Sequence, residues 1–187
     1  AVVAAAAVTF VVWELFGPKL ASIKLNIPET GNGTPDLLNE VRWNLEWMLK
    51  MQDDDGGVWH KQTSEHFCDF VMPEDDRLPS EVIGTGKAPY KSTCATADLA
   101  AVGAIAARVY KPYDAKFAAQ ALDAARRAWA GTEKNPDVTF RNPPGVTTGE
   151  YGDANCKDER LWAAAELWRA TGEAAYHDFF LKNYAEF

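Results

Sequence analysis

Apolar residues recur every three to four positions along most of the chain, which is the spacing of one face of an α-helix. Leu38, Val41 and Leu45, for example, fall on one side of such a helix. The pattern predicts six helices and an all-α fold. The expected helices span residues 3–16, 34–52, 95–110, 114–129, 157–170 and 173–184.

Residues with special backbone chemistry mark the expected helix ends. Gly17-Pro18 should stop the first helix, because proline lacks the amide hydrogen that a continuing helix needs. Thr34 is placed to cap the second helix, with Pro35 in its first position. Asp114 is placed to cap the fourth.

The connections between these helices alternate between long and short. Residues 19–33, 53–92 and 135–155 form long loops, and the last two are rich in Pro, Asp and Gly, whereas residues 111–113 and 171–172 make tight turns. Long connections in a compact domain usually carry function. The alternation predicts αα-hairpins closed into a ring, with the long loops forming a cleft on one face. We expect one domain over residues 1–187 and no separate second domain.

Composition narrows the range of partners. The net charge of −8 argues against a nucleic-acid partner and against a basic membrane-binding patch. The apolar stretch of residues 1–16 has no basic segment before it, is interrupted by Glu14 and is too short to cross a bilayer. We therefore expect a buried helix there and no membrane partner. The aromatic content of 12% fits a large core or an aromatic-lined groove.

The three cysteines say little about function. An odd and sparse set does not indicate a disulfide framework, and Cys94, at the start of an Ala-rich segment, is expected in the core. A zinc site made of His60, His66 and Cys68 is conceivable, but their spacing matches no tight zinc-ligand pattern.

Carboxylates stand together at three places. Asp158-Glu159 opens a helix directly after a loop whose carbonyls are free to bind a cation, which suits Ca²⁺ and its preference for oxygen ligands. The alternative is a favourable interaction with the helix dipole. The acidic runs at residues 53–55 and 74–76 are either solvated turns or paired acid–base groups.

Several segments, taken in order, form a recognisable set. They include Gly-Val-Trp-His-Lys-Gln-Thr at residues 57–63 and Thr-Gly-Glu-Tyr-Gly-Asp at residues 148–153. The others are residues 35–52, 71–76, 92–102 and 158–167. Together they resemble glycoside hydrolase family 9, and the resemblance covers essentially the whole chain.

The resemblance implies part of an (α/α)6 barrel, about half of it, with the remainder of the barrel as a partner. It also implies a secreted enzyme, extracellular or periplasmic, that hydrolyses β-1,4-glucosidic bonds of cellulose or related β-glucans by inversion. An Asp would serve as general base and a Glu as general acid. Neither is expected within residues 1–187, so no catalytic residue is assigned in this chain.

The resemblance also implies roles for individual residues. His60 matches a histidine that contacts sugar, Tyr151 matches a tyrosine beside the scissile bond, and Trp59 is placed to stack on a sugar ring. The implied calcium ligands are Asp158, Glu159 and the carbonyls of Ala154 and Asn155. No organic cofactor is implied. Trp43, Trp47 and Trp162 are expected in the core.

Two other functions remain open at this point. One is an exo-acting glucosidase or glucosaminidase on the same scaffold. The other is a non-catalytic helical module that binds glycan or protein, which the absence of both catalytic carboxylates favours. Turnover of a soluble β-glucan separates the enzymes from the binding module.

Overall fold

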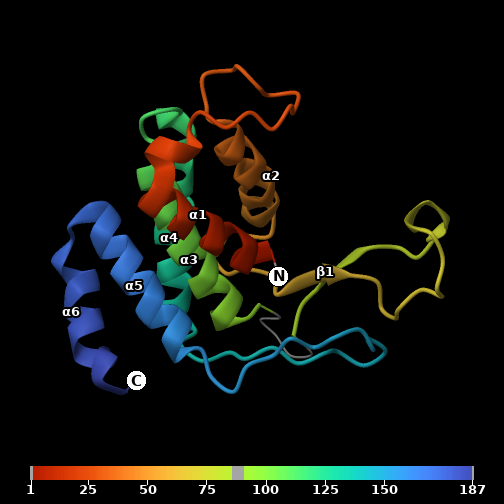
Figure 1. Cartoon of the computed structure of the whole chain (residues 1–187). Coiled ribbons are helices and arrows are strands. Elements are labelled where there is room, and N and C mark those ends of the chain that lie inside the picture. The colour runs from red at the N-terminus through yellow and green to blue at the C-terminus, as the bar shows by residue number, and fades with distance from the viewer. Residues whose placement is uncertain (1, 86–90, 187) are drawn as a thin grey trace.

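The computed structural model describes residues 2–85 and 91–186, with the backbone alone for Val2. It is mostly helical, as the apolar spacing predicts (Figure 1). Two short strands, β1 (Lys61–Thr63) and β2 (Glu81–Ile83), pair antiparallel. Short 3₁₀ helices cover Pro73–Asp75 and Tyr184–Glu186. The α-helices are α1 (Val2–Leu20), α2 (Asp36–Lys50), α3 (Thr93–Tyr110), α4 (Ala115–Lys134), α5 (Lys157–Thr171) and α6 (Ala174–Asn183).

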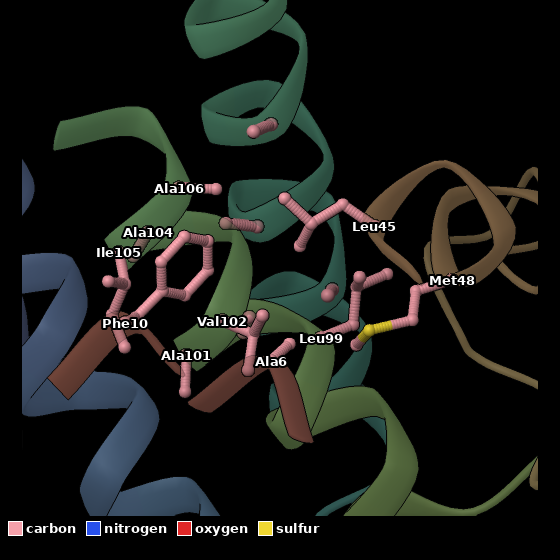
Figure 2. Close-up of a cluster of buried hydrophobic side chains, with 14 of the residues drawn as sticks. Ala6, Phe10, Leu45, Met48, Leu99, Ala101, Val102, Ala104, Ile105 and Ala106 are labelled. Atoms are coloured by element: carbon pink, nitrogen blue, oxygen red, sulfur yellow. The ribbon is translucent and has the colours of Figure 1, made fainter. Parts of the chain in front are cut away.

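Helix α3 is the centre of the molecule. It packs against α4 and α5, contacts α1 and α2, and is buried along almost its whole length. Its small side chains allow this close approach: a Cβ on Gly103 would lie 3.0 Å from the carbonyl oxygen of Ala121 on α4. Larger side chains, including Phe10, Leu45 and Met48, fill the space between α1, α2 and α3 (Figure 2).

Two of the three long connections gather at one end of the helices, as predicted. Residues 51–92 lead into the N-terminus of α3, and residues 135–156 lead into the N-terminus of α5. The two connections are bonded to each other, since the Thr147 amide donates to the Glu65 carbonyl at 2.6 Å. The short turns lie at the opposite end, and so does the third long connection, residues 21–35, which lines a pocket together with Tyr113 of the turn between α3 and α4 (Figure 1). The prediction that all long loops share one face is therefore wrong for this loop, and the other two form one continuous face at the N-terminal ends of α3 and α5.

Helix α1 departs from two expectations. It continues through Gly17-Pro18 to Leu20, because Pro18 costs one hydrogen bond near the helix end while the Gly17 carbonyl still accepts from Ala21 at 2.8 Å. It is also not fully buried. Phe10 and Trp13 pack against the core, but the opposite side is exposed apolar surface, made of Val8, Val11, Val12, Leu15 and Phe16.

The length argument against a membrane span of α1 does not hold. Residues Val3–Leu20 form 18 helical residues with a mean hydropathy of 1.5, which is long and apolar enough by length and composition alone. Only 22% of this segment is buried. Ion pairs nevertheless tie α1 to the body of the protein, since Glu14 bonds Arg108 of α3 and Arg169 of α5. The absence of a membrane partner stays a prediction.

The predicted cap of α2 is wrong, whereas that of α4 is confirmed. Helix α2 begins at Asp36, with Pro35 in the cap position. Asp36 turns its carboxylate to the preceding loop, where it accepts from Thr30 at 2.7 Å and from the Leu25 amide at 2.8 Å. The bond from Thr30 is the main reason that the pKa of Asp36 lies below its usual value. Asp114 caps α4 by accepting from the Phe117 amide at 2.9 Å.

The tryptophans of α2 and α5 only partly follow the prediction. Trp43 is 66% exposed, so its predicted place in the core is wrong. It lies two residues from Val41 and Leu45, on the side of α2 that turns away from α3. Trp47 and Trp162 are half-buried against the core.

A disulfide joins the two helix starts below the loop face. Cys94 in the first turn of α3 is bonded to Cys156, the residue before α5. The cysteine count gave no indication of this bond, whereas the expected burial of Cys94 is confirmed. The partners are 62 residues apart, and only the packing of α5 against α3 brings them together. Cys68 is free and exposed.

Candidate functional site

His60 lies on the loop face in an extended segment that precedes β1. Its Nδ1 is 2.9 Å from Ser92 Oγ, and its Nε2 is 3.1 Å from the carbonyl oxygen of Tyr151. A carbonyl only accepts, so Nε2 carries the hydrogen and Nδ1 accepts the hydroxyl of Ser92. The ring stacks on Phe140 with 4.1 Å between centroids. Burial lowers the pKa of His60, which favours this neutral form.

Tyr151 stands beside His60 with its ring in solvent. Its side chain is 81% exposed, and its backbone has a φ of +50°, in the left-handed region. The ring lies against Gly149, where a Cβ would come within 2.8 Å of ring carbons. The absence of a side chain at Gly149 therefore leaves room for the Tyr151 ring. The structure thus brings together the two residues that the sequence predicts to contact sugar, although they are 91 positions apart.

Trp59 is half-buried next to His60. Its amide donates to the Met51 carbonyl at 3.0 Å, and the Lys91 ammonium lies 5.2 Å from its ring centroid. Lys91 also binds Asp53 and Asp55, which identifies the acidic run at residues 53–55 as ion-paired. The bond from Lys91 holds the pKa of Asp53 below its usual value. These two carboxylates therefore do not behave as a catalytic acid–base pair.

Three further residues of this site were not singled out in the sequence. Phe140 is fully buried beneath His60, and Ser92 both caps α3 and orients the His60 ring. Lys61 is 9% exposed and turns its ammonium into the loop that leads to Tyr151. Its position next to His60 in the sequence could have indicated that Lys61 belongs to the site. An isolated lysine in a polar segment, however, normally has a solvated side chain.

A second group of polar side chains lies at the start of α5. Glu159 Oε2 is buried and has no hydrogen-bond partner in the described structure. Burial raises the pKa of Glu159 to about 8, and Asp158 and Asp98 push it in the same direction. Asp98, on α3, was not identified from the sequence. Burial raises its pKa to about 7, and the charge of Asp158 adds to the effect.

The predicted carbonyl ligands border the same group. The Asn155 carbonyl oxygen lies 3.7 Å from Cys94 Sγ, and a Glu159 carboxylate oxygen lies within 4.8 Å of both disulfide sulfurs. Ala154 is exposed, and its amide donates to Asp153. Asp158 is exposed at the first turn of α5. The Glu159 carboxylate and the Asn155 carbonyl thus both lie beside the Cys94–Cys156 disulfide.

Two groups of residues could be considered for zinc, and neither supports a zinc site. Cys94, Cys156 and Glu159 lie close enough to share an ion, but the two sulfurs are bonded to each other and supply no thiolate. His66 and Cys68 are exposed on the loop beyond β1. His60 already has partners at both ring nitrogens. Within the part of the chain that the structure describes, these three residues form no such group.

Comparison with known proteins assigns the family. The chain matches the glycosyl hydrolase family 9 profile over residues 2–187 and belongs to that family. It is 38% identical over 180 residues to Endoglucanase D of Acetivibrio thermocellus. The aligned region covers 95% of this chain and 28% of that protein. It is 40% identical over 183 residues to the xyloglucan-specific endo-beta-1,4-glucanase BoGH9A of Bacteroides ovatus, covering 92% of this chain and 30% of that one.

Solved structures agree on the fold. The Bacteroides ovatus GH9 structure matches with a TM-score of 0.89 and 38% identity, over 97% of this chain and 34% of that one. The GH family 9 endoglucanase J30 matches with a TM-score of 0.90 and 35% identity, over 99% and 34%. The predicted fold class, part of an (α/α)6 barrel, is therefore confirmed. The chain spans about a third of the length of these relatives.

Proposed function

We propose that this chain is part of an enzyme that hydrolyses β-1,4-glucosidic bonds in cellulose or related β-glucans, as an endoglucanase. The observation that carries the proposal is the juxtaposition of His60 and Tyr151 on the loop face of a family 9 fold. The names of the relatives support it, since they include endoglucanases and a xyloglucan-specific glucanase. A further match at 36% identity is AaCel9A in complex with cellobiose-like isofagomine.

The residues of this chain would bind and orient the substrate. Neutral His60 presents an Nε2–H that now donates to the Tyr151 carbonyl and that a sugar hydroxyl can share. The exposed ring of Tyr151 offers an apolar face and a hydroxyl to a pyranose. Trp59 provides a second, half-buried aromatic surface. The general base and general acid of an inverting reaction are expected outside residues 1–187, so no proton transfer is assigned here.

We predict that His60→Ala lowers kcat/KM on a soluble β-glucan about ten- to a hundredfold in the full chain. The substitution removes a hydrogen-bond donor for the sugar and the bond that holds the Tyr151 carbonyl. His177→Ala on α6 is the matched control, because His177 stacks on Trp168 and shares no contact with the loop face. Initial rates of reducing-sugar release measure both variants.

The same assay separates the alternatives. Shortening of long chains indicates endo cleavage, whereas release of single sugars from chain ends indicates the exo-acting enzyme. Binding of β-glucan without turnover by the full chain would support the non-catalytic module. Wild-type activity that His60→Ala leaves unchanged would contradict the role of His60.

We also propose that Ca²⁺ is held at the start of α5. Asp158, Glu159 and the carbonyls of Ala154 and Asn155 would hold it, and all of them are the oxygen donors that Ca²⁺ prefers. The donor set fits this ion because Glu159 Oε2 is buried without a partner in the described structure, which a cation would relieve. The ion would tie the loop to α5 and take no part in the reaction.

We predict that Ca²⁺ raises the melting temperature and that a chelator lowers it. An ion that binds only the native state stabilises it by about 2.7 kcal/mol at a hundredfold excess over Kd. Glu159→Gln should abolish the shift, whereas Asp153→Asn, on the exposed loop beside it, should retain it. Thermal unfolding with Ca²⁺, Mg²⁺ or chelator measures this. No shift in the wild type would leave Asp158 and Glu159 as helix-dipole partners.

Secretion to an extracellular or periplasmic compartment remains part of the proposal. The Cys94–Cys156 disulfide supports it, because such bonds persist mainly in oxidising compartments.

A further inference from the structure

Lys61 directs a buried ammonium at a single short segment of the neighbouring loop. Its Nζ donates to the carbonyl of Gly149 at 2.7 Å, to Thr148 Oγ1 at 3.2 Å and to the Thr148 carbonyl at 3.4 Å. Lys61 is 9% exposed and Thr148 is 4% exposed, so water does not replace these bonds. The lysine therefore clamps two consecutive residues that lie 87 and 88 positions away.

The clamped segment is joined to the chain that continues from β1. The amides of Thr147 and Thr148 donate to the Glu65 carbonyl, at 2.6 and 3.4 Å. Thr148 Oγ1 donates to the Ser64 carbonyl at 3.2 Å while it accepts from Lys61. These bonds align the loop beside the strand. Lys61 adds the contacts at the end of the segment that is nearer to Tyr151.

Two adjacent residues thus hold the two ends of the turn that carries Tyr151. Lys61 binds the Gly149 carbonyl, and His60 binds the Tyr151 carbonyl at 3.1 Å. Between them lies the Phe140 ring, which stacks on His60 and lies 5.4 Å from the Lys61 ammonium. The Tyr151 ring lies against Gly149, so the position of Gly149 limits where the ring can lie.

A lysine at this position is costly for stability alone. No ion pair joins its ammonium to a carboxylate in the described structure, and burial lowers the pKa of Lys61 although the charge of Glu150 opposes this shift. An apolar side chain of similar length would fill the same space without the loss of hydration. An apolar side chain, however, cannot donate hydrogen bonds to the carbonyl oxygens of Thr148 and Gly149, and so cannot fix the direction of the turn that leads to Tyr151.

We propose that Lys61 is a positioning residue for the sugar-binding site at Tyr151. It holds the Thr148–Gly149 peptide so that Tyr151, whose ring lies against Gly149 and whose carbonyl accepts from His60, keeps its place on the loop face. The proposal rests on the β-glucanase function proposed above, since it names a residue that keeps that site in order without touching the sugar.

The test compares Lys61→Met with Lys61→Arg in the full chain. Lys61→Met keeps the length of the side chain and removes the donors, whereas Lys61→Arg keeps charge and donors. Lys116→Met, at an exposed position of α4, is the matched control. Two quantities are measured: kcat and KM on a soluble β-glucan, and hydrogen exchange of the amides of residues 147–152 without substrate.

We expect Lys61→Met to speed exchange in residues 147–152 and to lower kcat/KM, each about ten- to a hundredfold, because charged hydrogen bonds are lost. Exchange in α3 and α4 should stay at the wild-type rate. Lys61→Arg should recover part of both losses. Lys116→Met should match the wild type throughout.

Other outcomes are equally decisive. A folded Lys61→Met with wild-type exchange and wild-type kcat/KM overturns the proposal, as does slower catalysis with no change in exchange. If Lys61→Met does not fold, Thr148→Val removes one of the three contacts, and wild-type exchange and kcat/KM in that variant overturn it as well. If the wild type neither binds nor cleaves β-glucan, the proposed function fails, and the exchange data still decide whether Lys61 positions Tyr151.

Discussion

Replacing Cys94 and Cys156 together by alanine is expected to lower the free energy of unfolding by about 4 kcal/mol. The disulfide closes a loop of 62 residues, so its loss returns a large conformational freedom to the unfolded chain. Both side chains are buried, so alanine leaves only small gaps. Urea unfolding in the full chain measures the difference, and addition of a thiol reductant to the wild type should reproduce it.

The third cysteine provides the control for this experiment. Cys68 is free and exposed, so Cys68→Ala should change the unfolding free energy by less than about 0.5 kcal/mol. A double alanine variant as stable as the wild type would contradict the prediction. It would show that packing of α3 on α5 is sufficient to stabilise this region without the disulfide. Because Glu159 and Asn155 lie next to the disulfide, the double variant should also bind Ca²⁺ more weakly.

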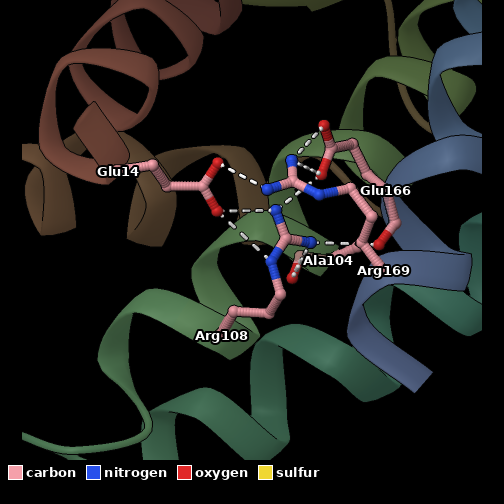
Figure 3. Close-up of polar contacts among 5 residues, drawn as sticks. All are labelled: Glu14, Ala104, Arg108, Glu166 and Arg169. Carbon is pink, nitrogen blue, oxygen red and sulfur yellow. Dashed lines mark hydrogen bonds and ion pairs between the residues drawn. The ribbon is translucent and has the colours of Figure 1, made fainter. Parts of the chain in front are cut away.

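Arg108→Met is expected to cost about 3 kcal/mol of unfolding free energy. The Arg108 guanidinium bonds Glu14 at 2.9 Å and Glu166 at 2.6 Å, and it also reaches the Glu166 carbonyl at 3.1 Å (Figure 3). The side chain of Glu166 is only 11% exposed. Removing the guanidinium leaves two carboxylates whose remaining ion-pair partner, among the residues that the structure describes, is Arg169.

The partial exposure of the Glu14, Arg108, Glu166 and Arg169 cluster sets the size of this expected loss of unfolding free energy. Glu14, Arg108 and Arg169 line an open cavity of about 570 Å³, so water reaches one side and the cost falls at the low end of the range for buried pairs. Arg127→Met is the control. Arg127 pairs with Asp123 on the exposed face of α4, where such a pair contributes about 0–1 kcal/mol. Equal effects of the two substitutions would contradict a buried cluster.

The pH dependence provides an independent measurement of the same cluster. Burial opposes ionisation of Glu14, but the bonds from Arg108 and Arg169 outweigh it and keep its pKa below the usual value. The native state therefore takes up this proton at a lower pH than the unfolded state does. The contribution is complete above the ordinary glutamate pKa of 4.5 and is lost as the pH falls below it. Arg108→Met should reduce this part of the acid destabilisation.

The sequence alone was sufficient for the helices and for the site face. Apolar spacing predicted both ends of α3, α5 and α6 and the start of α4 to within two residues, because that spacing is a local property of each segment; α4 runs five residues past its predicted end, to Lys134. The family motifs predicted His60 and Tyr151 as sugar contacts, and the structure places these two residues together on the loop face. These features depend on residues that are close in sequence or on short patterns that are specific in themselves.

Tertiary structure alone decided the contacts between distant segments. The Cys94–Cys156 bond, the approach of Asp98 to Glu159 and the clamp of Lys61 on Thr148 each join residues at least 61 positions apart. The two wrong predictions on α2 also depend on tertiary structure. Asp36 begins the helix and binds a preceding loop, and Trp43 faces away from the core. Spacing along the chain carries no information about such pairs. They form only because packing of α5 and the two long loops around α3 places their partners within reach.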